Sequence, residues 1–388
     1  MRNLRLFEMR GSARQRKASV DQKPARFGMR FGARLAVITV FTCFFFGVGS
    51  IVNAQSDVAE FLKAEKVDAN TLVQAYLNPY GKAFGDGLNM GWYNSAKTHK
   101  LGGLDFAIIA TGIQIATSDQ AFDIIKLKLQ KLSLENPSDH LAPTVAGRME
   151  LGPKLVAKDS DGSTAFSFNT PDGAGMNFVP MPMVQLTFGA LPHTDLIGRF
   201  VPEVKYDNDG DQMKVDFWGI GVKHNFMEWL PGLKELPFDA AVFGSISQVN
   251  GQSGLTLTPE DYNEPTATVT YNNTNDQLLK LKTKTSRFGL VVSKKLGVLT
   301  FFGGLGQCKS ETTINVFGKY PVLSKDSKGN LIISDDDAIY DPVSISFKTS
   351  NFCADLGVRL KLGFFSMFAS VNKAEYVSYT SGISLGFR

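Results

Sequence analysis

The final stretch of the chain, EYVSYTSGISLGFR (residues 375–388), alternates almost without interruption between apolar and small polar residues. Its apolar face is formed by Val377, Tyr379, Ile383, Leu385 and Phe387. The opposite face carries serine, threonine and glycine, whereas a water-facing sheet surface usually bears charges. This combination is typical of a membrane β-barrel strand, which has lipid on one side and a crowded lumen on the other.

Similar two-residue periodicity recurs from residue 83 to the end of the chain and predicts an all-β fold. The expected strands cover 84–95, 103–116, 121–132, 145–157, 163–169, 181–190, 195–204, 212–226, 237–250, 278–294, 299–317, 343–362, 364–371 and 376–387. About fourteen strands, with twelve as the lower bound, suit a closed bacterial barrel, which needs an even number. We therefore predict a transmembrane antiparallel β-barrel.

The connections between these strands sort by length. Short turns such as KKLG (294–297) and LPHTD (191–195) fall on the side of the C-terminus, and long polar stretches such as 250–276 fall on the other side. Short turns on one rim and long loops on the other are the arrangement of outer-membrane barrels.

Two of the expected strands change their apolar face along their length. In the strand 343–362, apolar residues occupy odd positions up to Phe347 and even positions from Phe352, so we expect a β-bulge between them. In the strand 278–294, Leu279 and Phe288 differ in parity, so we expect a second switch near residues 285–287.

The start of the chain has a different composition. Its first 34 residues hold ten Lys or Arg and two acidic residues, a charge of +8, so the rest of the chain carries −4 of the total +4. An apolar run that ends in Val-Asn-Ala before Gln55 predicts a cleaved secretory signal peptide over residues 1–54, with Met29 as the expected true start. The basic charge then lies in a discarded segment and predicts no nucleic-acid partner.

Two short helices are expected after the signal peptide. Asp57 and Glu60 have the spacing of a capping box, and a second helix is expected to begin at Asp68 and to end at Pro79. We predict that residues 55–82 form a helical plug in or under the lumen and that residues 83–388 form the barrel.

Cys308 and Cys353 are the cysteines that follow the signal peptide. They lie at nearly equal heights on neighbouring expected strands, and both would meet an oxidising periplasm. A disulfide also needs matching register and face. The pattern leaves this open, so a disulfide and two unpaired wall residues both remain as interpretations.

Charged residues at expected lumen-facing positions are the candidate functional residues. They are Lys126, Lys128, Lys280, Lys282, Lys284, Arg287, Asp355, Arg359 and Lys361. One interpretation is a basic lumen that attracts anionic solutes. The other is ordinary lumen lining, in which Lys280, Lys282 and Lys284 lie near the outer rim and contact lipopolysaccharide phosphates.

No catalytic residue, metal or cofactor is predicted. The stretch DNDGD (207–211) has the carboxylate spacing of a calcium loop but lacks the later glutamate of such a loop. The four histidines are scattered without ligand spacing, and no GxSxG, HExxH, P-loop or CxxC motif is present. We therefore expect a protein that is not an enzyme.

Several stretches together resemble a family. AYLNP, GLNMGWYNSAK, DLIGRFVPEVK, FWGIGVKH and LPGLKELPFDAAV are similar to an uncharacterised domain family of Gram-negative bacteria whose members are presumed to be outer-membrane barrels. The expected architecture, a barrel with a short N-terminal plug, resembles the long-chain fatty-acid transporters of the outer membrane. The C-terminal strand resembles the signal read by the barrel-assembly machinery, although Arg388 follows the aromatic Phe387.

These resemblances and patterns together imply a protein of the bacterial outer membrane, in contact with its lipid and lipopolysaccharide. The expected function is a passive channel or transporter for a small solute in the lumen, with hydrophobic solutes among the candidates. The alternative is a structural or surface-interaction barrel that acts through its long extracellular loops.

Overall fold

The computed structural model describes residues 61–62, 66–158, 164–208, 211–230, 232–233, 235–262, 265–272 and 276–387. The predicted signal peptide and the expected capping box at Asp57 lie outside the described residues. No described helix is both long and apolar enough to cross a membrane.

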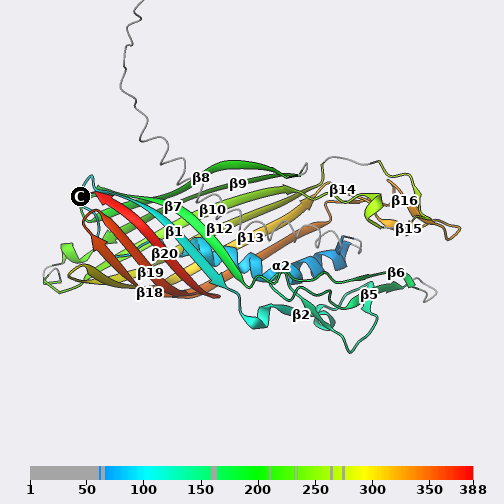
Figure 1. Cartoon of the computed structure of the whole chain (residues 1–388), viewed down its shortest axis with the longest axis horizontal. Coiled ribbons are helices and arrows are strands. Elements are labelled where there is room, and N and C mark those ends of the chain that lie inside the picture. The colour runs from blue at the N-terminus through cyan, green and yellow to red at the C-terminus, as the bar shows by residue number, and fades with distance from the viewer. Residues whose placement is uncertain are drawn as a thin grey trace, which may run out of the picture. The chain divides into compact units, whose positions relative to one another are not determined.

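Ten strands pair edge to edge into a closed barrel (Figure 1). In order around the wall they are β1 (Leu104–Gln114), β20 (Val377–Phe387), β19 (Phe365–Lys373), β18 (Val343–Leu362), β13 (Leu299–Phe317), β12 (Leu278–Leu296), β10 (Asp239–Gly254), β9 (Asp211–Asn225), β8 (Thr194–Asn208) and β7 (Phe178–Leu191). All pairs are antiparallel, and β1 closes the ring on β20 with Leu104 opposite Phe387. The predicted all-β antiparallel barrel is confirmed, but the expected number of about fourteen wall strands is wrong.

Four expected strands lie outside the wall. Residues 84–95 belong to the end of helix α2 (Lys66–Asn89) and to the irregular segment after it. The other three lie in the connection between β1 and β7, where short strands pair only with one another. These strands are β2 (Ala121–Asp123), β3 (Leu132–Leu134), β4 (Leu141–Pro143), β5 (Lys154–Lys158) and β6 (Thr164–Asn169). Period-two alternation shows that one face of a strand is buried, but it does not show which sheet buries it.

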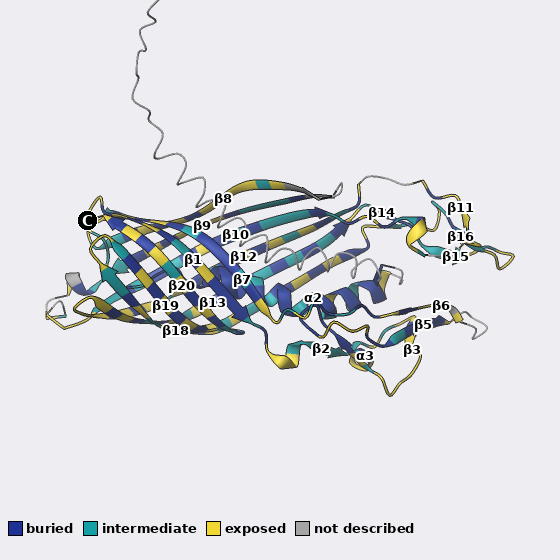
Figure 2. Cartoon of the chain, viewed as in Figure 1, coloured by how far each residue is buried: buried dark blue, intermediate teal, exposed yellow. Residues whose placement is uncertain are grey.

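The last strand has the two faces that its alternation predicts. Tyr379, Ile383 and Phe387 point outward and are about half exposed, whereas Ser378 and Ser384 are buried in the lumen. Figure 2 shows the resulting alternation of exposed and buried positions along the wall. A band of outward apolar side chains therefore surrounds the half of the barrel nearest the C-terminus, as a lipid-spanning wall requires.

The two expected changes of face do not occur. In β18, Phe347 and Cys353 are both buried, and pairing with β13 runs without a shift from Val343 to Leu360. In β12, Leu279 and Arg287 likewise both point inward in an unbroken register. The polarity of the inward and outward faces changes along these strands because the interior of the barrel differs between its two ends. On the loop side, the inward apolar residues contact a helix and the outward residues are polar.

That helix is α2, which lies inside the barrel against β12, β13 and β18 (Figure 1). It continues past Pro79 to Asn89, so the expected end at Pro79 is wrong and the expected plug boundary at residue 82 falls within the helix. Packing on both sides outweighs the local cost of the proline. At Gly81 the helix approaches the wall so closely that a Cβ atom would lie 2.3 Å from the ring of Phe347.

The connection between β1 and β7, residues 115–177, covers the side of α2 that the tall wall strands leave open. The carboxylate of Asp68 accepts hydrogen bonds from the backbone N–H groups of Gln130 (2.8 Å), Lys131 (2.8 Å) and Leu132 (3.0 Å). The hydroxyl of Tyr76 donates to the carbonyl of Asp172 at 2.9 Å. The loop-side half of the lumen is therefore filled by an apolar core like that of a soluble protein.

Cys308 on β13 and Cys353 on β18 form a disulfide, with their Cα atoms 5.9 Å apart. Cys308 lies directly opposite Asn351, so the bond runs diagonally between the two strands. Both side chains point inward and are buried beside Met90. Of the two interpretations that the sequence left open, the structure has the bonded pair.

Candidate functional site

The C-terminus of α2 lies in the lumen and is held by two wall arginines. The last carbonyl groups of a helix lack partners within the helix, and the last turn of α2 carries no basic residue of its own. Arg199 of β8 donates to the carbonyls of Leu88 (3.3 Å) and Met90 (3.0 Å). Arg287 of β12 donates to the carbonyl of Asn89 at 3.1 Å. The partial negative charge of the helix end therefore meets two cations.

The positive charges of the two arginines are compensated by different groups. Arg287 forms a buried ion pair with Asp355 of β18, and the hydroxyl of Tyr93 donates to the same carboxylate at 2.7 Å. For Arg199 the structure gives no carboxylate partner among the described residues. Its guanidinium lies 3.9 Å from the ring centre of Trp92 and donates to the side-chain oxygen of Gln185 at 3.0 Å.

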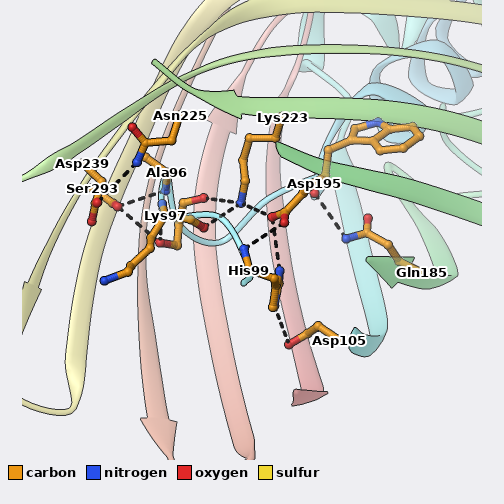
Figure 3. Close-up of polar contacts among 12 residues, drawn as sticks. Ala96, Lys97, His99, Asp105, Gln185, Asp195, Lys223, Asn225, Asp239 and Ser293 are labelled. Atoms are coloured by element: carbon orange, nitrogen blue, oxygen red, sulfur yellow. Dashed lines mark hydrogen bonds and ion pairs between the residues drawn. The ribbon is translucent and has the colours of Figure 1, made fainter. Parts of the chain in front are cut away.

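After α2 the chain continues through the lumen toward the rim that holds the C-terminus, a part we call the lower lumen. This extended segment, residues 90–103, is called the strap. It lacks regular secondary structure, so its backbone groups need partners from the wall. Lys223 of β9 donates to the strap carbonyls of Ser95 (2.9 Å) and Lys97 (3.0 Å) and forms an ion pair with Asp195 at 3.2 Å (Figure 3). The backbone N–H of His99 donates to Asp195 at 2.8 Å.

The opposite side of the strap is held in the same way. The N–H of Ala96 donates to the hydroxyl of Ser293 on β12 at 2.9 Å, and Gln185 of β7 donates to the carbonyl of Trp92 at 3.2 Å. Figure 3 shows these side chains converging on the strap from several strands. Polar contacts therefore fix the strap backbone to the wall, while Trp92 and Tyr93 of the strap pack in an apolar cluster with wall residues such as Phe243.

A further buried charge cluster joins wall strands to one another near the C-terminal rim. Arg359 of β18 lies 3.7 Å from the carboxylate of Asp105 on β1 and donates to the hydroxyl of Ser366 at 2.9 Å. Ser384 donates to Asp105 at 3.1 Å. Asp105 also lies 4.0 Å from His99 of the strap, but Arg359 itself forms no hydrogen bond or ion pair with the described residues of the strap or α2. Arg359 is therefore a useful reference for Arg199 and Arg287.

The structure divides the nine predicted lumen residues. Arg287, Asp355 and Arg359 are buried in the lumen, and Lys361 is half buried at an inward position. Lys280, Lys282 and Lys284 are exposed on the outer face of β12, so their predicted lumen position is wrong. The prediction assigned them to the wrong face of β12, because the apolar residues between them face α2 and not lipid.

Lys126 and Lys128 are also misplaced by the sequence prediction. Lys126 lies in α3 (Ile124–Leu127) and Lys128 caps the end of that short helix. Both belong to the connection that covers α2, outside the barrel wall, and the Lys126 side chain is 83 % exposed. A strand had been expected there because apolar and basic residues alternate over a few positions.

Sequence reasoning missed the residues that hold the strap most directly. Arg199 and Lys223 were within expected strands, and each shares its parity with small or apolar lumen-facing residues such as Ile197 and Gly221. A charge on an otherwise small or apolar lumen face is costly unless it is paired. That cost was a signal for a partner inside the lumen.

The wall is interrupted between β7 and β8. The two strands pair from the turn near the C-terminal rim only as far as Gln185 opposite Arg199. Beyond that rung β7 remains paired with β1 up to Phe178, and β8 remains paired with β9. Figure 1 shows the two strands diverging toward the loop side. We call this interruption, between residues 178–184 and 200–208, the seam.

A family model described as "Family of unknown function (DUF6588)" matches residues 33–387. A search of curated proteins found no match.

Solved structures similar to this chain include three outer-membrane proteins. The outer membrane protease OmpT of Escherichia coli is 9 % identical, with 76 % of this chain and 100 % of that chain covered and a TM-score of 0.28. The attachment invasion locus protein Ail of Yersinia pestis is 8 % identical, with 74 % and 100 % covered and a TM-score of 0.24. A Pseudomonas aeruginosa FadL homologue is 10 % identical, with 81 % and 93 % covered and a TM-score of 0.22. At these TM-scores the likenesses carry no argument about function.

Proposed function

We propose, from the premise that the chain belongs to the family of unknown function DUF6588, that it is a plugged outer-membrane barrel through which a small apolar solute passes. The observation that carries the proposal is the seam between β7 and β8. A wall built only to seal the membrane has no reason to leave two neighbouring strands unpaired from the edge of its apolar band onward.

The seam begins at the edge of the apolar band. Val184 on β7 and Phe200 on β8 are the outward apolar residues at that end, whereas farther along β8 the exposed residues include Glu203 and Lys205. Unpaired backbone groups in hydrocarbon are costly, and this cost normally keeps barrel strands zipped.

Prolines lower that cost at this position. Pro180 and Pro182 lie within β7, and the pairing of β7 with β1 continues past both residues. The side of β7 without N–H donors is therefore the side that faces β8. Pro202 on β8 removes a further donor. Among the described strands of the wall, prolines occur only in β7 and β8, the two strands that border the seam.

An apolar interior lies directly behind the seam. Met181, Met183 and Phe217 are buried and belong to the same apolar cluster as Leu88 of α2. A solute that entered through the seam would meet these apolar side chains first. The strap, which is hydrogen-bonded to the wall and carries its own apolar cluster around Trp92 and Tyr93, lies beyond them. Passive movement of an apolar molecule, limited by displacement of the plug, fits this order better than passage of an ion.

The surface-interaction alternative also has an observation in its favour. The long loops build small sheets of their own, in which β11 (Thr268–Val269) pairs with β16 (Leu331–Ile333), and β14 (Lys319–Tyr320) pairs with β17 (Ile339–Tyr340). Ordered loops suit a binding surface. This function requires neither the seam nor a movable plug.

Locking the seam tests the transport proposal. Val184→Cys with Phe200→Cys places a cysteine pair on the rung beyond Gln185 and Arg199. Ile220→Cys with Ile246→Cys is the matched control on a pair that is already zipped. The readout is uptake of the apolar fluorescent probe N-phenyl-1-naphthylamine by intact cells that express the full chain.

We expect the oxidised seam pair to reduce uptake to the level of cells without the protein, and we expect reductant to restore it. The control pair should leave uptake unchanged in both states. Wild-type uptake no greater than that of cells without the protein would reject transport of such probes and favour the surface-interaction function.

A further inference from the structure

We propose that the outer face of β12, β13 and β18 binds the phosphates of lipopolysaccharide. The proposal does not depend on transport through the barrel. It rests on how outward lysines are placed relative to the apolar band.

The apolar band ends at a sharp line on these strands. Phe288 of β12 and Phe352 of β18 are 67 % and 66 % exposed, and both lie opposite Gln307 of β13, which starts the polar region. Large exposed aromatic residues at such a line mark the boundary between hydrocarbon and headgroups.

Lysines follow directly on the loop side of that line. Lys309 lies two residues beyond Gln307, and Lys284 lies four residues beyond Phe288. At about 3.4 Å per residue and a tilt of about 40°, these steps correspond to roughly 5 and 10 Å above the hydrocarbon. A lipid headgroup region is about 5 to 8 Å deep, so Lys309 lies within it and Lys284 lies just above it.

The lysine array continues farther from the membrane. Lys282 and Lys280 follow on β12 and line a surface groove of about 320 Å³, together with Lys214 and the carboxylates of Glu203 and Asp216. A phospholipid headgroup ends below this height. Lipopolysaccharide extends above it, because phosphorylated sugars continue outward from its lipid anchor.

The outer surface of these strands, which we call the patch, carries more lysines than carboxylates. Six lysines and two carboxylates point outward on this part of β9, β10, β12, β13 and β18, although the chain beyond its first 34 residues is net negative. Lys348 pairs with Glu311 at 3.0 Å, and Asp216 accepts from Asn250 at 2.7 Å. Lys282, Lys284 and Lys309 have no carboxylate partner among the described residues, so they are free for an external anion.

The test removes these three charges together. The variant is Lys282→Gln/Lys284→Gln/Lys309→Gln. The matched control is Lys100→Gln/Lys294→Gln/Lys295→Gln, which removes three exposed lysines at the opposite rim. Native mass spectrometry of the full chain in detergent measures its binding of purified rough-type lipopolysaccharide, of the same lipid after dephosphorylation, and of phosphatidylglycerol.

Each lysine near a charged lipid surface changes affinity by about five-fold, so the triple variant should bind lipopolysaccharide about 100-fold more weakly than the control. Dephosphorylated lipopolysaccharide and phosphatidylglycerol should both bind wild type more weakly than the intact lipid does. Equal lipopolysaccharide binding by variant and control would overturn the proposal, as would equal binding of the dephosphorylated form. Equal binding of phosphatidylglycerol would reduce the patch to a general attraction for anionic lipid and would also overturn it. Heat-modifiable gel mobility of each variant verifies that the barrel has formed.

Discussion

Replacing Arg199 with leucine should release the plug. Arg199 joins three parts of the molecule, because its guanidinium contacts the end of α2, the ring of Trp92 on the strap and Gln185 on β7. Leucine fills part of the space but donates no hydrogen bond. The carbonyls of Leu88 and Met90 would then be buried without this donor.

The size of the effect follows from these contacts. Each buried carbonyl left without a donor costs about 1 to 3 kcal/mol, and a desolvated cation–π contact adds about 2 kcal/mol. Relief from burying a guanidinium without a carboxylate partner offsets part of this loss. A net weakening of about 2 to 4 kcal/mol corresponds to a roughly 30- to 700-fold larger population with the plug displaced.

Hydrogen exchange of the strap amides measures that population directly, since protection falls by the same factor. The matched control is Arg359→Leu, which removes a second buried lumen arginine that contacts only the wall. We expect lower protection of residues 90–103 in the Arg199 variant only, together with more frequent openings in planar bilayers. Equal strap protection in the two variants would refute the idea that the arginine at the helix end keeps the plug closed.

Three further predictions concern stability. Gly357→Ala should impair barrel formation in heat-modifiability gels because a Cβ there would lie 2.4 Å from the Phe302 ring, whereas Gly244→Ala, with its nearest neighbour at 3.8 Å, should form normally. Cys308→Ser should lower the free energy of unfolding in urea by about 4 kcal/mol, since the disulfide closes a loop of 45 residues; an unchanged midpoint would contradict this. Burial raises the pKa of Asp86, which lies on α2 and not on a wall strand, to about 7. The folded state therefore binds the proton more tightly than the unfolded state, so lowering the pH from 8 to 5 should stabilise the plug by about 3 kcal/mol in hydrogen exchange, and Asp86→Asn should abolish that dependence.

The membrane-facing half of the fold was predictable from sequence. Wherever lipid lies outside and small polar residues lie inside, as on β20, alternation alone identifies both faces. The loop-side half was not predictable in this way, because α2 supplies apolar surface inside the lumen. Ile345 faces that helix and Lys282 faces away from it, which inverts the polarity without any change of backbone parity.

The candidate site was predictable only in part. Arg287, Asp355 and Arg359 were identified because they share strands with strongly apolar outward neighbours. The strap was not predictable, because GLNMGWYNSAK alternates well enough to resemble a strand. Its backbone partners are instead side chains of separate wall strands, such as Lys223 on β9 and Ser293 on β12. Periodicity describes a segment's own faces. It does not tell whether the segment belongs to the wall or lies within it.

The direction in which the plug runs has a consequence for assembly. Lys66 lies at the loop end, where it donates to the carbonyl of Tyr340, and the chain descends from there through the lumen to begin β1 at the opposite rim. A finished ring would have to be threaded by this segment, whereas a growing sheet can simply wrap around it. We therefore expect helix and strap to be enclosed while the wall is still open, and we expect the pairing of β20 with β1 to close the wall around them last. In this scheme α2 and the strap form the core around which the wall strands assemble.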